Sequence, residues 1–203
     1  MNNIIVVVGI GWQQKKSILY LKKLNYIILG IDNNANPFCK RNVDYFINVN
    51  TDDITKCFKL IKKYTNGPKY IFSFVSDKTM LSASLLREKF NLDGIKPYQV
   101  KKLINKKTQK IIFTKNRINI PNYELISKSN LQINFNSKNY IAKPIDGSGS
   151  RGVFLLDKKI NLITAFNNSI KYSKKKQIII EEFIKGGEFS LESIYYNKKT
   201  YIL

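Results

Sequence analysis

The chain has 203 residues, which is enough for one large domain or two small ones with a packed core. Its content of 43% hydrophobic and 12% aromatic residues is typical of a folded protein. No apolar run approaches the roughly 18 residues that a membrane-spanning helix needs, and no basic segment precedes the first apolar run. We therefore expect a soluble, cytoplasmic protein with no membrane partner.

The formal net charge is +21, which by itself favours a polyanionic partner. The lysines are, however, spread along the chain among many isoleucines and asparagines, and the basic clusters are short. Neither aromatic platforms between these clusters nor a recognition-helix pattern is visible, so we expect no nucleic-acid partner. A polyanion-binding protein stays as an alternative, whose affinity would fall steeply with salt.

The cysteine and histidine content excludes several kinds of site. Cys39 and Cys57 are far apart in the sequence, and the chain contains no histidine. A zinc site, a Ser-His-Asp triad and a Cys-His pair are therefore excluded, and we expect two reduced thiols.

Residues 1–95 alternate between strand and helix patterns, which predicts a parallel sheet with right-handed crossovers. The predicted strands cover residues 4–10, 26–32, 44–49 and 69–75. The predicted helices cover residues 17–25, 52–64 and 77–90.

A short glycine motif follows the first predicted strand. Gly9 and Gly11, with Asp32 ending the second strand, favour a dinucleotide site. Gln14 stands where the third glycine of that motif belongs, and its side chain would hinder close helix packing. We interpret the motif as a tight strand-to-helix turn, with dinucleotide binding as the weaker alternative.

We place a domain boundary near residue 95, with residues 94–99 as linker. A basic helix is predicted over residues 101–113, followed by a loop that contains Pro121. Further strands are predicted at 140–144, 152–156, 177–183 and within 189–203, and one helix at 162–172.

A glycine-rich turn lies within the stretch IAKPIDGSGSRGVFLL, residues 141–156. Its backbone N–H groups can converge on a phosphate, while Lys143 and Arg151 are placed to neutralise phosphate charge. The turn consists of Gly147, Ser148, Gly149, Ser150, Arg151 and Gly152. No GK[ST] follows, and a strand rather than a helix comes next, so this is not a Walker loop. The alternative is a mobile hairpin with a charged flank.

The stretch IIIEEFIKGGEFSLES, residues 178–193, favours the phosphate interpretation. Backbone groups of Glu181 and Ile184, where an apolar strand ends, can meet the edge of an adenine ring. Glu188, after two glycines, can accept hydrogen bonds from ribose hydroxyls.

Together the two stretches closely resemble the ATP-grasp superfamily of carboxylate-amine ligases, which includes L-amino-acid ligases, biotin carboxylase and carbamoyl-phosphate synthetase. The resemblance extends backward through the Asn105-Lys106 pair and the loop at residues 118–121. It implies an α/β protein in which residues 1–95 form a Rossmann-like, parallel-sheet domain. Residues 96–203 would then form an incomplete α+β ATP-grasp domain, with a linker helix, the small subdomain and the start of the large one.

The resemblance also implies residue roles. Lys106 and Lys143 match the lysines that contact ATP phosphates, and residues 147–152 match the loop that folds over them. Glu181, Phe183 and Ile184 match the hinge that holds adenine, and Glu188 matches the ribose-binding glutamate. The implied reaction is ATP-dependent activation of a small-molecule carboxylate as an acyl phosphate, followed by attack of an amine or similar nucleophile. Magnesium would offset the phosphate charge.

In this family the magnesium ligands lie on later strands, so we expect none within this sequence and expect the chain alone to be incomplete for catalysis. Three explanations stay open, of which we favour the first. The chain is a truncated product of a full ligase, a half-enzyme completed by a partner chain or within a homodimer, or a non-catalytic nucleotide-binding module.

Overall fold

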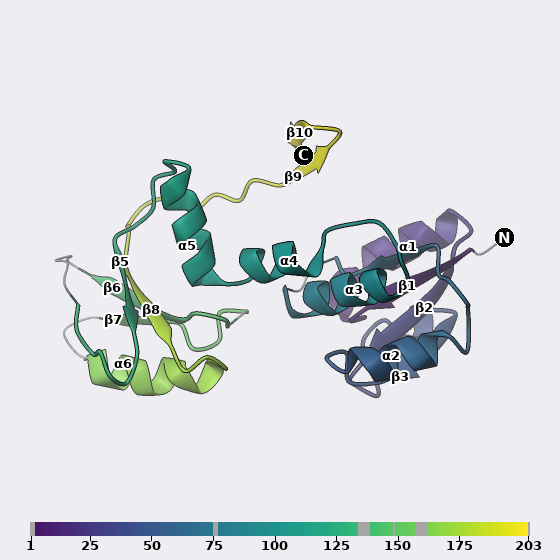
Figure 1. Ribbon diagram of the computed structural model, residues 1–203, viewed down its shortest axis with the longest axis horizontal. Coiled ribbons are helices and arrows are strands. Elements are labelled where there is room, and N and C mark those ends of the chain that lie inside the picture. Colours follow the sequence, from purple (N-terminus) through teal and green to yellow (C-terminus); the bar gives the residue numbers. More distant parts are fainter. Residues whose placement is uncertain (1–2, 75–76, 134–138, 148, 157–161, 203) are drawn as a thin grey trace.

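The computed structural model describes residues 3–74, 77–133, 139–147, 149–156 and 162–202. It contains two four-stranded sheets and a separate two-stranded hairpin. Figure 1 shows the two sheets at opposite ends of an elongated molecule, joined by helices α4 and α5.

The first sheet is parallel and has the strand order β3-β2-β1-β4. Its strands are β1 (Ile4–Val8), β2 (Ile27–Asp32), β3 (Tyr45–Asn48) and β4 (Tyr70–Phe72). Its helices are α1 (Lys15–Lys23), α2 (Ile54–Ile61) and α3 (Asp77–Lys89). The predicted parallel α/β arrangement is confirmed.

Both faces of this sheet are apolar. Strand β1 sends Val6 and Val8 into one buried cluster and Ile5 and Val7 into another, as the two-residue repeat of a strand requires. A sheet covered on both faces buries near-continuous apolar runs such as IIVVV, which explains why these strands are visible in the sequence.

The turn after β1 is fixed by the close approach of Thr79 and by hydrogen bonds to Asp32. Gly9 has φ +75°, and a Cβ atom there would lie 2.9 Å from Cγ2 of Thr79. The Asp32 carboxylate accepts hydrogen bonds from the backbone N–H of Ile10 at 2.8 Å and of Asn34 at 2.9 Å. These contacts support the interpretation as a tight turn. Two short 3-10 helices, η1 (Trp12–Gln14) and η2 (Lys40–Asn42), lie in the loops near this edge.

The prediction of one helix over residues 101–113 and a linker at 94–99 is wrong in detail. The structure has two helices, α4 (Pro97–Leu103) and α5 (Lys106–Lys115). Asn105 has an extended backbone and caps α5, since its side-chain oxygen accepts from the Thr108 N–H at 3.0 Å. Pro97 starts α4, where its fixed φ and missing N–H fit the first helical position.

The second sheet is antiparallel, with the order β5-β8-β6-β7. Its strands are β5 (Tyr123–Ile126), β6 (Tyr140–Pro144), β7 (Phe154–Leu156) and β8 (Ile178–Glu182). Helix α6 (Leu162–Ser169) continues into the 3-10 helix η3 (Ile170–Tyr172) and covers one face with an apolar cluster. Figure 1 shows α5 on the opposite side of the strands from α6.

The chain continues through an exposed segment into a hairpin of β9 (Ser193–Tyr196) and β10 (Lys199–Ile202). Figure 1 shows this hairpin apart from both larger sheets. The segment and the hairpin leave large apolar side chains exposed, among them Phe189 at 93% in the segment and Ile202 at 70% in β10. None of the helices that the structure describes is both long enough and apolar enough to cross a membrane.

Candidate functional site

The glycine-rich turn connects β6 to β7. Gly152 has φ +74°, and a Cβ atom there would lie 2.6 Å from Cδ2 of Tyr172 and 2.9 Å from Cγ of Pro144. Gly149 has φ +65° with open space around it, and Ser150 has φ +55°. Glycine is therefore required at 152 for close approach and favoured at 149 by its backbone conformation. Ser148 lies outside the described residues.

The start of the turn is anchored by Asp146. Its carboxylate accepts hydrogen bonds from the Ser173 hydroxyl at 2.6 Å and from the backbone N–H groups of Lys174 at 3.1 Å and Lys175 at 3.2 Å. The turn's other end is held by the Ser169 hydroxyl, which donates to the Gly152 carbonyl at 2.7 Å. These anchors could not be recognised in the sequence, because their partners are more than a dozen residues away in the chain.

Lys106 joins the start of helix α5 to the turn. Its ammonium donates to the Gly147 carbonyl at 2.6 Å, and its backbone N–H donates to the Ile145 carbonyl at 3.1 Å. The structure therefore brings together one of the two predicted phosphate lysines and the predicted phosphate loop.

Lys143 and Glu181 lie on neighbouring strands of the second sheet. Glu181 on β8 is opposite Ile141 on β6, so Lys143, two residues further along β6, shares its face. The Lys143 ammonium donates to Oε2 of Glu181 at 2.6 Å, and Glu181 is only 5% exposed. A residue predicted to bind phosphate and a residue predicted to bind adenine are thus direct neighbours.

Lys110 on α5 is a third member of this cluster that the sequence analysis missed. Its ammonium lies 3.1 Å from Oε1 of Glu181. Lys106 and Lys110 are four residues apart on one helix, so they lie on the same face. That spacing indicates in the sequence that Lys110 lies beside Lys106, but the partner of Lys110 could not be recognised without the strand order.

The electrostatics of the cluster keep Glu181 ionised. Burial by itself would raise the pKa of this carboxyl group, but the hydrogen bonds and charges of Lys143 and then Lys110 outweigh burial and lower the pKa. One carboxylate is therefore held between two ammonium groups, one on each oxygen.

Other predicted site residues lie further along the chain or at the surface. The Phe183 N–H donates to the Asn139 carbonyl at 3.0 Å, and Ile184 is 66% exposed. Glu188 is exposed on the segment that leads to β9, and Arg151 is exposed in the turn. The nucleotide roles of these four residues stay predictions.

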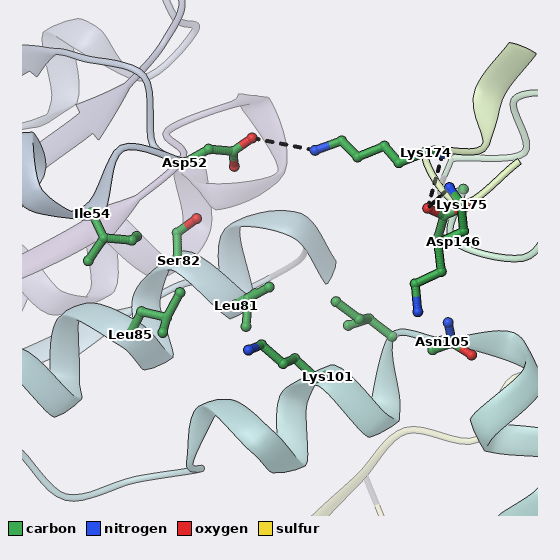
Figure 2. Close-up of a pocket in the computed structure, with 12 residues that line it drawn as sticks. Asp52, Ile54, Leu81, Ser82, Leu85, Lys101, Asn105, Asp146, Lys174 and Lys175 are labelled. Carbon is green, nitrogen blue, oxygen red and sulfur yellow. Dashed lines mark hydrogen bonds and ion pairs between the residues drawn. The ribbon is translucent and has the colours of Figure 1, made fainter.

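A cavity of about 520 Å³ lies between the first sheet's helices and the start of the turn. Figure 2 shows its walls, with Leu81, Ser82 and Leu85 from α3 facing Asp146 and Lys174. The Lys174 ammonium lies 3.9 Å from an oxygen of Asp52 across the cavity. Within the described part of the chain, no group of three or more His, Cys, Asp or Glu side chains could hold a metal ion.

Comparison with protein families agrees with this geometry. Residues 104–203 match a family model described as "ATP-grasp domain". A comparison with curated proteins gave no match.

Solved structures show the same fold over most or all of this chain. The L-amino acid ligase from Bacillus licheniformis has a TM-score of 0.78 at 16% identity, over 100% of this chain and 49% of the other. The ADP-complexed N5-carboxyaminoimidazole synthetase from Staphylococcus aureus has a TM-score of 0.66 at 16% identity, over 95% and 49%. The D-Alanine-D-Alanine ligase from Helicobacter pylori has a TM-score of 0.61 at 20% identity, over 100% and 73%. The chain spans about half the length of the first two, and its predicted α/β fold class and ATP-grasp resemblance are confirmed.

Proposed function

We propose that the chain binds Mg-ATP at the face of its second sheet for ATP-dependent ligation of a carboxylate to an amine, because residues 104–203 match the ATP-grasp domain model. The observation that carries the proposal is the contact of Lys106 with the Gly147 carbonyl. It assembles a lysine, a glycine-rich turn and the strand that bears Lys143 at one end of the sheet.

The residues present fit a polyphosphate. Lys106, Lys143 and Arg151 supply positive charge, and the turn supplies backbone N–H groups whose approach glycine permits. The carboxylate of Asp146 is already occupied by three donors, which reduces its repulsion of an anion beside the turn.

Each group has a separate task in the proposed mechanism. Lys106 and Lys143 donate to phosphate oxygens, and the turn excludes water from the transferring phosphoryl group. The backbone of Ile184, just past the end of β8, holds the adenine edge against Phe183, and Glu188 accepts from the ribose. The backbone of Glu181 is paired within the sheet with Ile141 and Tyr123, so Glu181 contributes its side chain instead. A magnesium ion carried by the nucleotide would offset charge on the phosphates.

In the reaction, a carboxylate oxygen of the substrate attacks the terminal phosphorus, and ADP leaves. The amine nitrogen then attacks the acyl phosphate carbon, phosphate leaves, and the amine loses a proton. We propose a small-molecule carboxylate as substrate, because two of the similar proteins are named as ligases of amino acids, which carry a carboxylate.

The test is calorimetric titration of the 203-residue chain with Mg-ATP. We expect Lys143→Ala to weaken binding by at least about tenfold, because a hydrogen bond between charged groups is lost. Lys59→Ala is the matched control, since it removes the same charge from an exposed position on α2. Equal losses in the two variants would mean that nucleotide responds only to net charge, which would favour the polyanion alternative.

A further inference from the structure

Glu181 has two lysine partners, and the second of them has no place in the proposed nucleotide contacts. We propose that Lys110 is a positioning residue that holds Glu181 in place while Lys143 moves from Glu181 to a nucleotide phosphate. The inference rests on the proposed function of this site.

The geometry allows the two lysines to act independently. Lys143 contacts Oε2 of Glu181 at 2.6 Å, whereas Lys110 contacts Oε1 at 3.1 Å. Since each carboxylate oxygen has its own ammonium, one lysine can leave without breaking the contact made by the other.

The exposed fractions of the two lysine side chains indicate which of them can turn from Glu181 to a ligand. The Lys143 side chain is 28% exposed, against 12% for Lys110 and 7% for Glu181. Lys143 also lies on the strand that enters the glycine-rich turn, four positions before Gly147. Lys110 is held more deeply, with its ammonium 5.6 Å from the centre of the Tyr123 ring. Tyr123 is paired with Glu181 in the sheet, so the ring and the carboxylate share a face of the sheet and both contact the Lys110 ammonium.

Charge explains why the second lysine matters for ligand binding. With Lys143 as its sole partner, Glu181 would become a buried, unpaired carboxylate when Lys143 turned to phosphate. Leaving a buried charge without a partner is strongly unfavourable, and the cost would reduce nucleotide affinity. With Lys110 in place, Glu181 keeps a counter-charge, and Lys143 can be transferred to the phosphate at little cost.

Lys110 should therefore affect nucleotide affinity only through Glu181. A double-mutant cycle detects this dependence of one residue's effect on the other. Mg-ATP is titrated into the full chain and into Lys110→Met, Glu181→Gln and the double variant, with thermal melting of each. We expect Lys110→Met to bind about tenfold more weakly, within the range of coupling energies for contacting residues. In the Glu181→Gln background, the same substitution should change affinity less than about twofold.

Two further variants separate charge from packing. Lys110→Arg should restore affinity, because a guanidinium also pairs with a carboxylate. Lys107→Met, an exposed position on the same helix, is the matched control and should leave affinity unchanged. If Lys110→Met does not fold, Lys110→Gln replaces it and should show the same loss.

The outcomes distinguish this inference from the proposed function. Absence of Mg-ATP binding by the unmodified chain would overturn the proposed function and this inference with it. Binding that Lys143→Ala weakens and Lys110→Met leaves unchanged would overturn the inference alone. An equal loss from Lys110→Met with Glu181 or Gln at position 181 would also overturn it, since Lys110 would then act independently of Glu181.

Discussion

The two four-stranded sheets of this protein differ in what their faces carry. The parallel sheet buries apolar side chains on both faces, as the two clusters on either side of β1 show. The antiparallel sheet buries an apolar cluster under α6 on one face, whereas its other face carries Lys143 and Glu181. The first sheet thus keeps both faces for its core, whereas the second keeps one face for charged side chains, and the proposed nucleotide site lies on that face.

The ionic groups of the two sheets differ in the same way. Asp44 beside the first sheet pairs with Lys22 at 2.8 Å, and both side chains are at least one-third exposed, at 33% and 39%. The side chain of Glu181 on the second sheet is 7% exposed and pairs with two lysines. Exposed pairs contribute little to stability, whereas a buried pair strongly penalises the loss of either partner. The second sheet therefore keeps charges in a position where they are energetically costly, which is typical of a functional site.

The largest expected effect comes from removing one core side chain from each sheet. Ile31 on β2 and Ile180 on β8 are both fully buried, so either substitution to alanine should cost about 2–5 kcal/mol. Each substitution should speed amide hydrogen exchange mainly in the sheet that carries the substituted residue, because the two apolar clusters share no residues. Exchange measured by mass spectrometry on both variants checks this. Equal acceleration in both sheets would show that they unfold as one unit and would contradict the expectation of two independent cores.

Most strands could be predicted from sequence for a local reason, but β5 (Tyr123–Ile126) was not among them. Runs such as residues 4–8 and 178–182 are apolar over their own length, and the glycine-rich turn is contiguous. The break between α4 and α5 was missed because apolar and basic residues continue at helical spacing through it. Asn105 was its signal, since asparagine is a strong cap, but the same residue type is frequent throughout this chain.

The ionic cluster could not be predicted because it depends on strand order. Glu181 is 38 residues after Lys143 and contacts it because β8 lies between β5 and β6. Sequence periodicity shows which residues share a face of one strand, but it does not show which strands are neighbours. Lys110 adds a helix that crosses the same face, and its contact with Glu181 is therefore visible only in three dimensions.

A smaller effect tests the turn on the second sheet. Gly152→Ala should destabilise the protein by about 1–3 kcal/mol, because it combines a positive φ with overpacking against Tyr172 and Pro144. Gly149→Ala is the matched control, with a similar φ and open space, and should cost about 1 kcal/mol. Urea unfolding of both variants measures the difference. Equal losses would mean that the Tyr172 ring moves aside freely and that close packing does not fix the turn.

The smallest effect concerns acid stability, which should separate the buried carboxylate from the exposed one. The pKa of Glu181 is lowered in the folded protein, since Lys143 and Lys110 outweigh the effect of burial. A lowered pKa contributes stability above the ordinary glutamate pKa of about 4.3, and this contribution is lost as pH falls through the folded pKa. The stability of the unmodified chain relative to Glu181→Gln should therefore be constant near neutral pH and fall on acidification.

Asp44→Asn provides the comparison on the first sheet. The pKa of Asp44 is also lowered, because the Ile28 N–H and Lys22 outweigh its partial burial, so the sign of its pH dependence is the same. Solvent screens this exposed pair, and its contribution should be the smaller of the two. Urea unfolding followed from neutral to acidic pH for both variants measures the two contributions. A larger acid-sensitive contribution from Asp44 than from Glu181 would contradict the view that the second sheet holds the energetically important charges.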